Sequence, residues 1–190
     1  MAAKRSRGLA KTGWELMDRK RNILIRELMG RVEQARQLQN EIDSRFAEAY
    51  TALRTAELTS GSGRELAAAV PVDESVKLRF KSVMGAELPT VTAAEKNADL
   101  LPYSLADSSA SMDEAYRAFT ALKPLIAELA ETETAVYRLA VSIQKSQKRA
   151  NALENVVIPN LDEDIRRISE VLEEREREEF VRMKVIKARK

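Results

Sequence analysis

Two short stretches of this sequence carry side chains at which binding chemistry could occur, and neither has the spacing that such chemistry needs. Three carboxylates are adjacent at Asp162-Glu163-Asp164, and carboxylate oxygens are ligands that Mg²⁺ and Ca²⁺ prefer. No ligand-bearing loop surrounds them, so we predict no metal site there. The stretch Gly61-Ser62-Gly63-Arg64 is glycine-rich, but it lacks the Lys-Ser/Thr pair of a phosphate-binding loop. We interpret it as a flexible hinge.

The composition argues against catalysis. The 190 residues include no histidine and no cysteine, which removes the commonest general base and the thiolate nucleophile. A hydrolase built on paired carboxylates would still need a pocket. Instead, 33% of the residues are charged and only 5% are aromatic, which favours long solvated helices. We therefore predict a protein that is not an enzyme, with no catalytic residue, no cofactor and no metal.

Basic residues are concentrated towards both ends of the chain. From Met1 to Arg31 there are nine Lys and Arg against three Asp and Glu, and Arg182 to Lys190 contains five basic residues and no acidic one. Such clusters can attract nucleic acid or an anionic membrane surface. The acidic stretch Glu170 to Glu179, interleaved with Arg175 and Arg177, is typical of a solvated helix face.

The sequence gives no sign of insertion into a membrane or of secretion. No apolar run approaches the ~18–20 residues that cross a bilayer. The basic start lacks the apolar core and cleavage pattern of a secretory signal. We therefore expect a cytoplasmic protein.

Glycine and proline divide the chain into three parts. Six of the eleven lie between Thr59 and Ser111, and such residues concentrate where a chain turns. We predict an N-terminal coiled-coil helix over 1–60, a middle segment over 61–111, and a C-terminal coiled-coil helix over 112–190.

The first arm has the apolar spacing of a coiled coil. A Thr-x-x-Glu capping box at Thr12 to Glu15 predicts a helix start. The apolar stripe that follows has a mean step of about 3.4 residues, near the coiled-coil value of 3.5. Its members are Ile25, Leu28, Val32, Ala35, Leu38, Ile42, Phe46, Ala49, Leu53 and Ala56.

The second arm carries a longer heptad seam. A capping box at Ser111 to Glu114 predicts its start, although Pro124 offers a later one. The seam then slips by one residue near Pro159, where the missing N–H predicts a kink or a looser turn. The seam residues are Ala115, Leu122, Leu129, Val136, Ile143, Ala150 and Val157, with Ala118, Leu125, Thr132, Leu139, Ser146 and Leu153 offset by three, and then Ile158, Leu161, Ile165, Ile168 and Leu172.

The middle segment contains a strand pattern. Val76, Leu78 and Phe80 alternate with basic residues, which is the period of a strand. A turn at Gly85 would lead to a second strand around Leu88 to Val91, in which Pro89 is compatible only with a sheet edge. We predict a short β-hairpin here, and loop with a short helical piece over Thr92 to Ser111.

These elements predict a mainly α protein, a long antiparallel coiled coil of two helices formed by the N- and C-terminal arms, with a small middle segment that contains the hairpin. Such a pair buries one stripe per helix and forms a rod with both termini at one end. A rod of this kind has little concave surface, so we expect no substrate pocket.

Three blocks of the sequence resemble a known family. They are Leu16 to Arg21 (LMDRKR), Ser82 to Pro89 (SVMGAELP), and Asn151 to Leu161 (NALENVVIPNL) with Glu173 to Lys184 (EEREREEFVRMK). Together they resemble the D subunits of the vacuolar/archaeal-type (V/A-type) rotary ATPases and ATP synthases, and they cover the chain in the family's order.

The resemblance implies a rotor shaft without an active site. Such a shaft would transmit torque between ATP hydrolysis or synthesis in a ring of A and B subunits and transport of H⁺ or Na⁺ by a membrane ring. It would pair 1:1 with the F subunit and dock through a socket-like C/d component, peripheral to the membrane, with no nucleic acid. The resemblance makes these residues candidates for shaft and subunit contacts: Arg19, Lys20, Arg21, Asn151, Glu154, Pro159, Arg175, Arg182 and Lys184.

An alternative stays open on the residues alone. A coiled-coil adaptor could use a basic end to bind nucleic acid or an anionic membrane surface. Heptad periodicity does not distinguish this function from that of a shaft.

Overall fold

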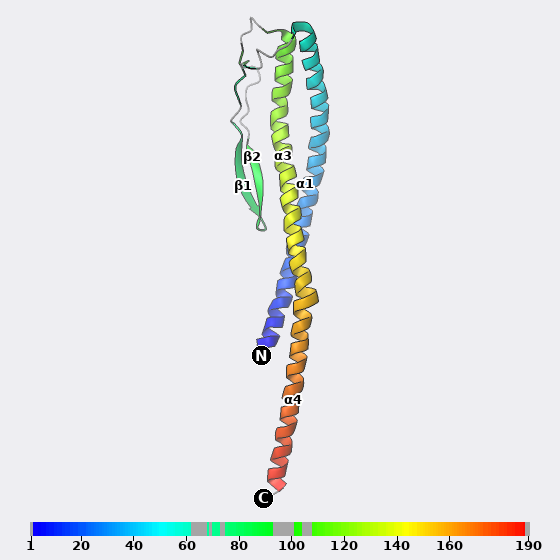
Figure 1. The fold of residues 1–190 in the computed structure, drawn as a ribbon, viewed down its shortest axis with the longest axis vertical. Helices are drawn as coiled ribbons and strands as arrows, with labels where there is room; N and C mark the ends of the chain where they lie inside the picture. The colour runs from blue at the N-terminus through cyan, green and yellow to red at the C-terminus, as the bar shows by residue number, and fades with distance from the viewer. Residues whose placement is uncertain are drawn as a thin grey trace. The chain divides into compact units, whose positions relative to one another are not determined.

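The structure is a computed structural model that describes residues 2–61, 68, 70–72, 75–92, 101–103 and 108–188 (Figure 1). A long helix α1 (Ala2–Ser60) precedes a hairpin of β1 (Lys77–Val83) and β2 (Ala86–Thr92). Helix α3 (Ala110–Ala152) then continues through a π-helical turn η1 (Leu153–Val157) into α4 (Ile158–Ala188). The predicted fold class, mainly α with two long helices and a short hairpin, is confirmed.

The chain divides into two compact units. The terminal unit contains Met1–Ile23 and Ile143–Lys190, and the central unit contains Leu24–Ser142. Within the central unit the two helices are antiparallel, because Gln34 contacts Glu128 whereas Thr59 contacts Ser111. The terminal unit has the same polarity, with contacts from Arg7 to Asp162 and from Arg21 to Gln147.

The core of the central unit is a line of small and apolar side chains. From α1 it takes Leu38, Ile42, Ala49 and Ala56, all members of the predicted stripe, and the predicted seam of α3 is also buried at Ala115, Leu122, Thr132 and Leu139. The prediction was wrong at Ile25, which is 38% exposed, whereas Leu24 is fully buried. Leu24 lies fourteen residues before Leu38, two whole heptads, and Ile25 falls one position out of phase.

The start of α1 differs from the predicted one. The helix begins at Ala2, and Thr12 donates its hydroxyl to the Gly8 carbonyl four residues back. Thr12 is therefore inside a helix rather than at its cap.

The end of α1 agrees with expectation, since α1 ends at Ser60 and Gly61 has φ 74°. That left-handed conformation is open to glycine, and the Gly61 N–H is bonded to the Glu57 carbonyl.

The start of α3 also corrects the prediction. The capping hydroxyl belongs to Ser109, which accepts a hydrogen bond from the N–H of Met112 at 3.3 Å, and not to Ser111. Ser111 lies within the first turn, close to the hydroxyls of Thr59 and Ser109. Pro124 lies inside α3 and does not mark its beginning, so the long helix passes through a position where the Thr120 carbonyl lacks its N–H partner.

The hairpin is closed by a two-residue turn. Met84 and Gly85 have φ of 50° and 75°, the positive values that a type I′ turn requires. Val83 therefore pairs with Ala86, and the register continues through Lys81 with Leu88 and Phe80 with Pro89. The predicted strand pair and its turn at Gly85 are confirmed.

No helix among the described residues is long and apolar enough to cross a bilayer. Most of the predicted hinge (Ser62, Gly63 and Arg64) and most of the Thr92 to Ser111 stretch lie outside the described residues.

We expect Leu139→Ala to destabilise the central unit by about 2–5 kcal/mol, because it leaves a cavity at a fully buried seam position. Urea unfolding followed by circular dichroism measures the effect. The control is Tyr137→Ala, at a side chain that is 71% exposed on the same helix, where the cost should stay within about 0.5 kcal/mol. Equal losses in the two variants would contradict the assigned core.

A second prediction concerns pH. Burial, reinforced by a hydrogen bond that the Tyr103 hydroxyl donates to Asp113 at 3.0 Å, raises the pKa of Tyr103 from 10.0 to about 12. The folded chain holds this proton more tightly than the unfolded chain, so the contribution is complete below about pH 10 and is lost towards about pH 12. Urea titrations should show a steeper loss of stability over this window in the wild type than in Tyr103→Phe. Parallel curves would refute the assignment.

Candidate functional site

The facing helices of the terminal unit are joined by polar side chains. Arg7 of α1 forms an ion pair with Asp162 of α4 at 2.5 Å. Further along α1, the Trp14 indole N–H donates to Glu154 at 3.2 Å. Because exposed pairs of this kind contribute little stability, they act mainly to set the register of one helix against the other.

A second polar group continues this line of contacts. The Arg21 guanidinium donates to the Gln147 side-chain carbonyl at 2.7 Å and pairs with Asp18 at 2.5 Å. Gln147 in turn donates to Asn151 at 2.9 Å. The group therefore ties α1 to the last turns of α3.

A glycine beside Trp14 lies at the contact between the two helices. Gly13 faces Leu153, and a Cβ added to the glycine would lie 3.7 Å from the leucine side chain. That distance is ordinary van der Waals contact, so an alanine would fit at this position without a shift of Leu153. The two helices therefore lie in contact range at the start of the π-helical turn, with room for one more carbon.

The register slip predicted near Pro159 is confirmed, and its form is a π-helical turn. Over Leu153–Val157 the helix is wider, and the Ile158 N–H is bonded to the Leu153 carbonyl five residues back. A single extra residue is accommodated in this way. Val157 is consequently exposed, whereas Ile158 is half-buried and takes over the seam. Pro159 follows at once, and its missing N–H removes the hydrogen bond that α geometry would make to Asn155.

The remainder of α4 has an apolar surface without a facing helix among the described residues of its unit. The predicted seam positions Ile168 and Leu172 are 47% and 53% exposed, contrary to the continuous seam that we predicted. The described α1 contacts α4 near its beginning, where Arg7 pairs with Asp162. Further exposed apolar side chains on α4 are Val171, Phe180, Val181, Met183, Val185 and Ile186.

The sequence-predicted contact residues fall into three groups. Arg21, Asn151 and Glu154 belong to the polar line between the helices, and Pro159 follows the π-helical turn. Arg19 is exposed and Lys20 half-buried on α1. On α4, Arg182 pairs with Glu178 at 3.8 Å and Lys184 lies 5.3 Å from the Phe180 ring centre, while Arg175 is exposed. The structure therefore brings the first group together and not the others.

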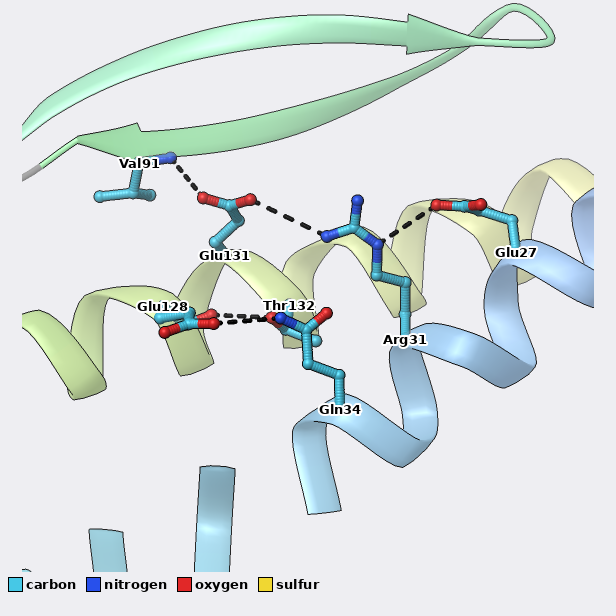
Figure 2. Close-up of polar contacts among 7 residues, drawn as sticks. All are labelled: Glu27, Arg31, Gln34, Val91, Glu128, Glu131 and Thr132. Atoms are coloured by element: carbon cyan, nitrogen blue, oxygen red, sulfur yellow. Dashed lines mark hydrogen bonds and ion pairs between the residues drawn. The ribbon is translucent and has the colours of Figure 1, made fainter. Parts of the chain in front are cut away.

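The hairpin is fastened to α3 by the backbone of β2. The Val91 N–H donates to the Glu131 carboxylate at 2.6 Å, and the Arg138 guanidinium donates to the Glu87 carbonyl at 3.0 Å. Figure 2 shows Glu131 between Val91 and Arg31, which also pairs with Glu27 at 3.3 Å. Hairpin and both helices of the central unit thus share one polar network.

The packing of the hairpin against α3 was not predicted from the sequence. Glu131 and Arg138 lie on the same helix face, and Ala135 between them is fully buried although it is outside the predicted seam. The covered part of the hairpin is Ala86, Leu88 and Pro89. The only sequence signal for this face was the spacing of four and then three residues between Glu131, Ala135 and Arg138. Because two of these three side chains are charged, the pattern does not resemble a core stripe.

The described surface carries little that could act on a small molecule. One open hollow of about 510 Å³ is lined by Asn160, Glu163, Asp164, Arg166, Arg167 and Glu170, all on α4. Within the adjacent carboxylates, Asp162 and Asp164 are engaged by Arg7 and Arg167. Across the described residues no group of three potential metal ligands is gathered.

Comparison with known proteins gives a family. The family model of the ATP synthase D subunit matches residues 1–188. A V-type ATP synthase D subunit from Thermotoga neapolitana is 42% identical over 189 residues, covering 98% of this chain and 93% of the relative. The D subunits of A-type ATP synthases are similar too: that of Methanopyrus kandleri is 36% identical (94% and 78% of the two chains), and that of Thermococcus kodakarensis 34% (97% and 88%).

Long paired helices with a docked hairpin define the chain as a coiled-coil protein. Because the family model covers nearly all of it, the chain belongs to the D-subunit family of ATP synthases. The resemblance drawn from the three sequence blocks is confirmed.

The π-helical turn predicts an unusual tolerance to deletion. Removing Val156, which is 55% exposed in that turn, in a Pro159→Ala background should leave a continuous heptad seam and cost less than about 1 kcal/mol. Removing the exposed Glu133 in the same background should cost several times more, about 3 kcal/mol or above, because it rotates the following seam residues by ~100°. Urea unfolding of the full chain measures both. Equal costs would show that the extra residue is not absorbed in this turn.

Proposed function

We propose that this chain is the central-stalk rotor shaft of a V/A-type rotary ATPase or ATP synthase. In this role it transmits torque between ATP hydrolysis or synthesis in a ring of A and B subunits and ion transport by a membrane ring. The observation that carries the proposal is the family match over residues 1–188. It favours the shaft over an adaptor that binds nucleic acid or an anionic membrane through a basic end.

The packing of the helices supports a mechanical role. A shaft must resist twisting, and close-packed interiors transmit strain because they have low compressibility. The seam includes small buried residues on both helices of the central unit, such as Ala49, Ala56 and Ala115. Small residues allow close approach, and close approach increases the number of dispersion contacts that twisting would break.

The surface supports a part that turns against its neighbours. Tight interfaces usually contain aromatic anchors, and only 5% of this chain is aromatic. Beside its exposed apolar side chains, α4 also carries exposed ion pairs, such as Arg166 with Glu170 and Arg177 with Glu173. Charged, well-solvated side chains make contacts that exchange at low cost.

The proposed partners follow from the family. The F subunit would bind as a 1:1 rotor pair, the A and B subunits would surround the shaft, and a socket-like C/d component would join it to the membrane ring. The chain itself would be non-catalytic and cytoplasmic, peripheral to the membrane. Among the predicted contact residues, the exposed Arg19 and Arg175 and the α4 residues Arg182 and Lys184 are proposed for contacts with other subunits. Arg21, Asn151, Glu154 and Pro159 are proposed to maintain the shaft, and the half-buried Lys20 is proposed for either role.

The test is a substitution in the seam. Ala150 is 3% exposed in α3, and Ala150→Pro removes one helix hydrogen bond and introduces a clash worth about 3 kcal/mol or more. In a complex reconstituted with the A, B and F subunits and the membrane sector, we expect ATP hydrolysis to continue while ion transport per ATP falls several-fold. Vesicle acidification or Na⁺ uptake, measured beside ATPase activity, gives the ratio.

The control for this experiment is Lys148→Ala, at an exposed position two residues earlier, which should leave the ratio unchanged. Unchanged coupling in Ala150→Pro would count against the helix pair as the torque carrier. A chain that ignores the F subunit and the A/B ring, and instead binds duplex DNA with a steep salt dependence, would support the adaptor.

A further inference from the structure

The two strands of the hairpin differ in what their outer edges contact. In a hairpin with a two-residue turn, the flanking pair exchanges both hydrogen bonds, and so does every second pair beyond it. Here the flanking pair is Val83 with Ala86. The residues whose backbone groups point away from the partner strand are therefore Glu87, Pro89 and Val91 on β2 and Leu78, Phe80 and Ser82 on β1.

The outer edge of β2 is bound to α3 through two of its backbone groups. Glu87 accepts from Arg138 and Val91 donates to Glu131. Pro89, between them, has no N–H to leave unpaired. Two α3 side chains therefore bind the backbone of this edge strand, and the proline between them removes an N–H that would otherwise be unpaired.

The outer edge of β1 is open. All of Lys77 to Ser82 is exposed, and none of the described residues bonds to the backbone N–H or C=O of Leu78, Phe80 or Ser82. Figure 1 shows β2 between β1 and α3, with β1 on the far side of the hairpin. An exposed strand edge with unpaired backbone groups is a template for one more strand.

The side chains of β1 specify what strand would fit. Lys77, Arg79 and Lys81 alternate with Leu78 and Phe80, so the three cations share one face of the strand and the apolar pair lies on the other. No ion pair among the described residues engages these cations. When two side chains lie directly across from each other on neighbouring strands, charges of opposite sign stabilise the pairing and charges of the same sign destabilise it. A second copy of β1 in register would bring cations together.

We propose that β1 is a docking edge for an extended segment of a partner protein, in which acidic and apolar side chains alternate and which adds to the hairpin as a third strand. The backbone of Leu78, Phe80 and Ser82 supplies the hydrogen bonds, and Lys77, Arg79 and Lys81 select acidic side chains. This inference is independent of the torque role, since it needs only the folded chain.

The experiment uses a fluorescein-labelled peptide, Glu-Val-Glu-Val-Glu-Val-Glu, and the full-length chain. Fluorescence anisotropy should give saturable binding at least about tenfold tighter than that of the Lys-Val-Lys-Val-Lys-Val-Lys peptide. Amide hydrogen exchange measured by NMR should slow at Leu78, Phe80 and Ser82 when the acidic peptide binds. No binding, or equal binding of both peptides, would overturn the proposal.

A matched pair of variants separates strand addition from charge attraction. Phe80→Pro removes an outward N–H without touching the β1–β2 ladder, whereas Phe80→Val keeps the N–H. Both variants lose the ring, which lies 5.1 Å from the Arg138 guanidinium carbon, so that contact cancels in the comparison. We expect Phe80→Pro to bind the acidic peptide about tenfold more weakly than Phe80→Val. Equal affinities would mean that the peptide is held by charge alone, and would overturn the proposal.

Two further measurements keep the result interpretable. Nuclear Overhauser contacts between Lys81 and Leu88 report whether the hairpin persists in Phe80→Pro, and Leu78→Pro repeats the test at a second outward amide if it does not. Sedimentation of the chain alone detects pairing of two copies through β1. A dimer that Phe80→Pro abolishes would overturn the choice of a foreign partner.

Discussion

The phase of the buried seam along the two long helices is the constraint on which the rest of the structure depends. A helix pair buries one stripe per helix, so a residue one position out of phase points to solvent. The pair Leu24 and Ile25 shows how sharply this acts: the two are adjacent and equally apolar, yet only Leu24 is buried. Small buried residues such as Ala49 and Ala150 then allow the close contact that large side chains would prevent.

The same constraint explains why the helix changes geometry where it does. An inserted residue in a seam must either rotate everything that follows or be absorbed locally. The π-helical turn at Leu153–Val157 absorbs it, and Pro159 adds a reason for the position, because an α-helical Asn155 carbonyl would face a residue with no N–H. The slip of the seam and the proline therefore both place the π-helical turn at this position. After it, the half-buried Ile158 and Leu161 are in phase with the opposite helix.

Much of this could be predicted from periodicity, and the failures have identifiable causes. Most of the seam, the hairpin and the slip at Pro159 follow from spacing alone, whereas the exposure of Ile25, Ile168 and Leu172 does not. The capping boxes misled at Thr12 and Ser111 because the same letters occur inside helices, where a hydroxyl can bond the preceding turn. The docking of β2 on α3 was invisible because it depends on the backbone of Glu87 and Val91 meeting charged side chains 40 or more residues away. No local pattern encodes such a contact.

The polar network around Glu131 links α1, α3 and the hairpin, three elements whose sequence patterns do not indicate that they are in contact. One carboxylate accepts from the Val91 N–H at 2.6 Å and lies 3.9 Å from Arg31 (Figure 2). A backbone donor at a strand edge is costly to leave unpaired, whereas the partly exposed ion pair adds little. The hydrogen bond to β2 is therefore the stronger of the two contacts. Arg31 lies one heptad after the buried Leu24 and one heptad before the buried Leu38, so a charged side chain interrupts the apolar seam where the hairpin is fastened.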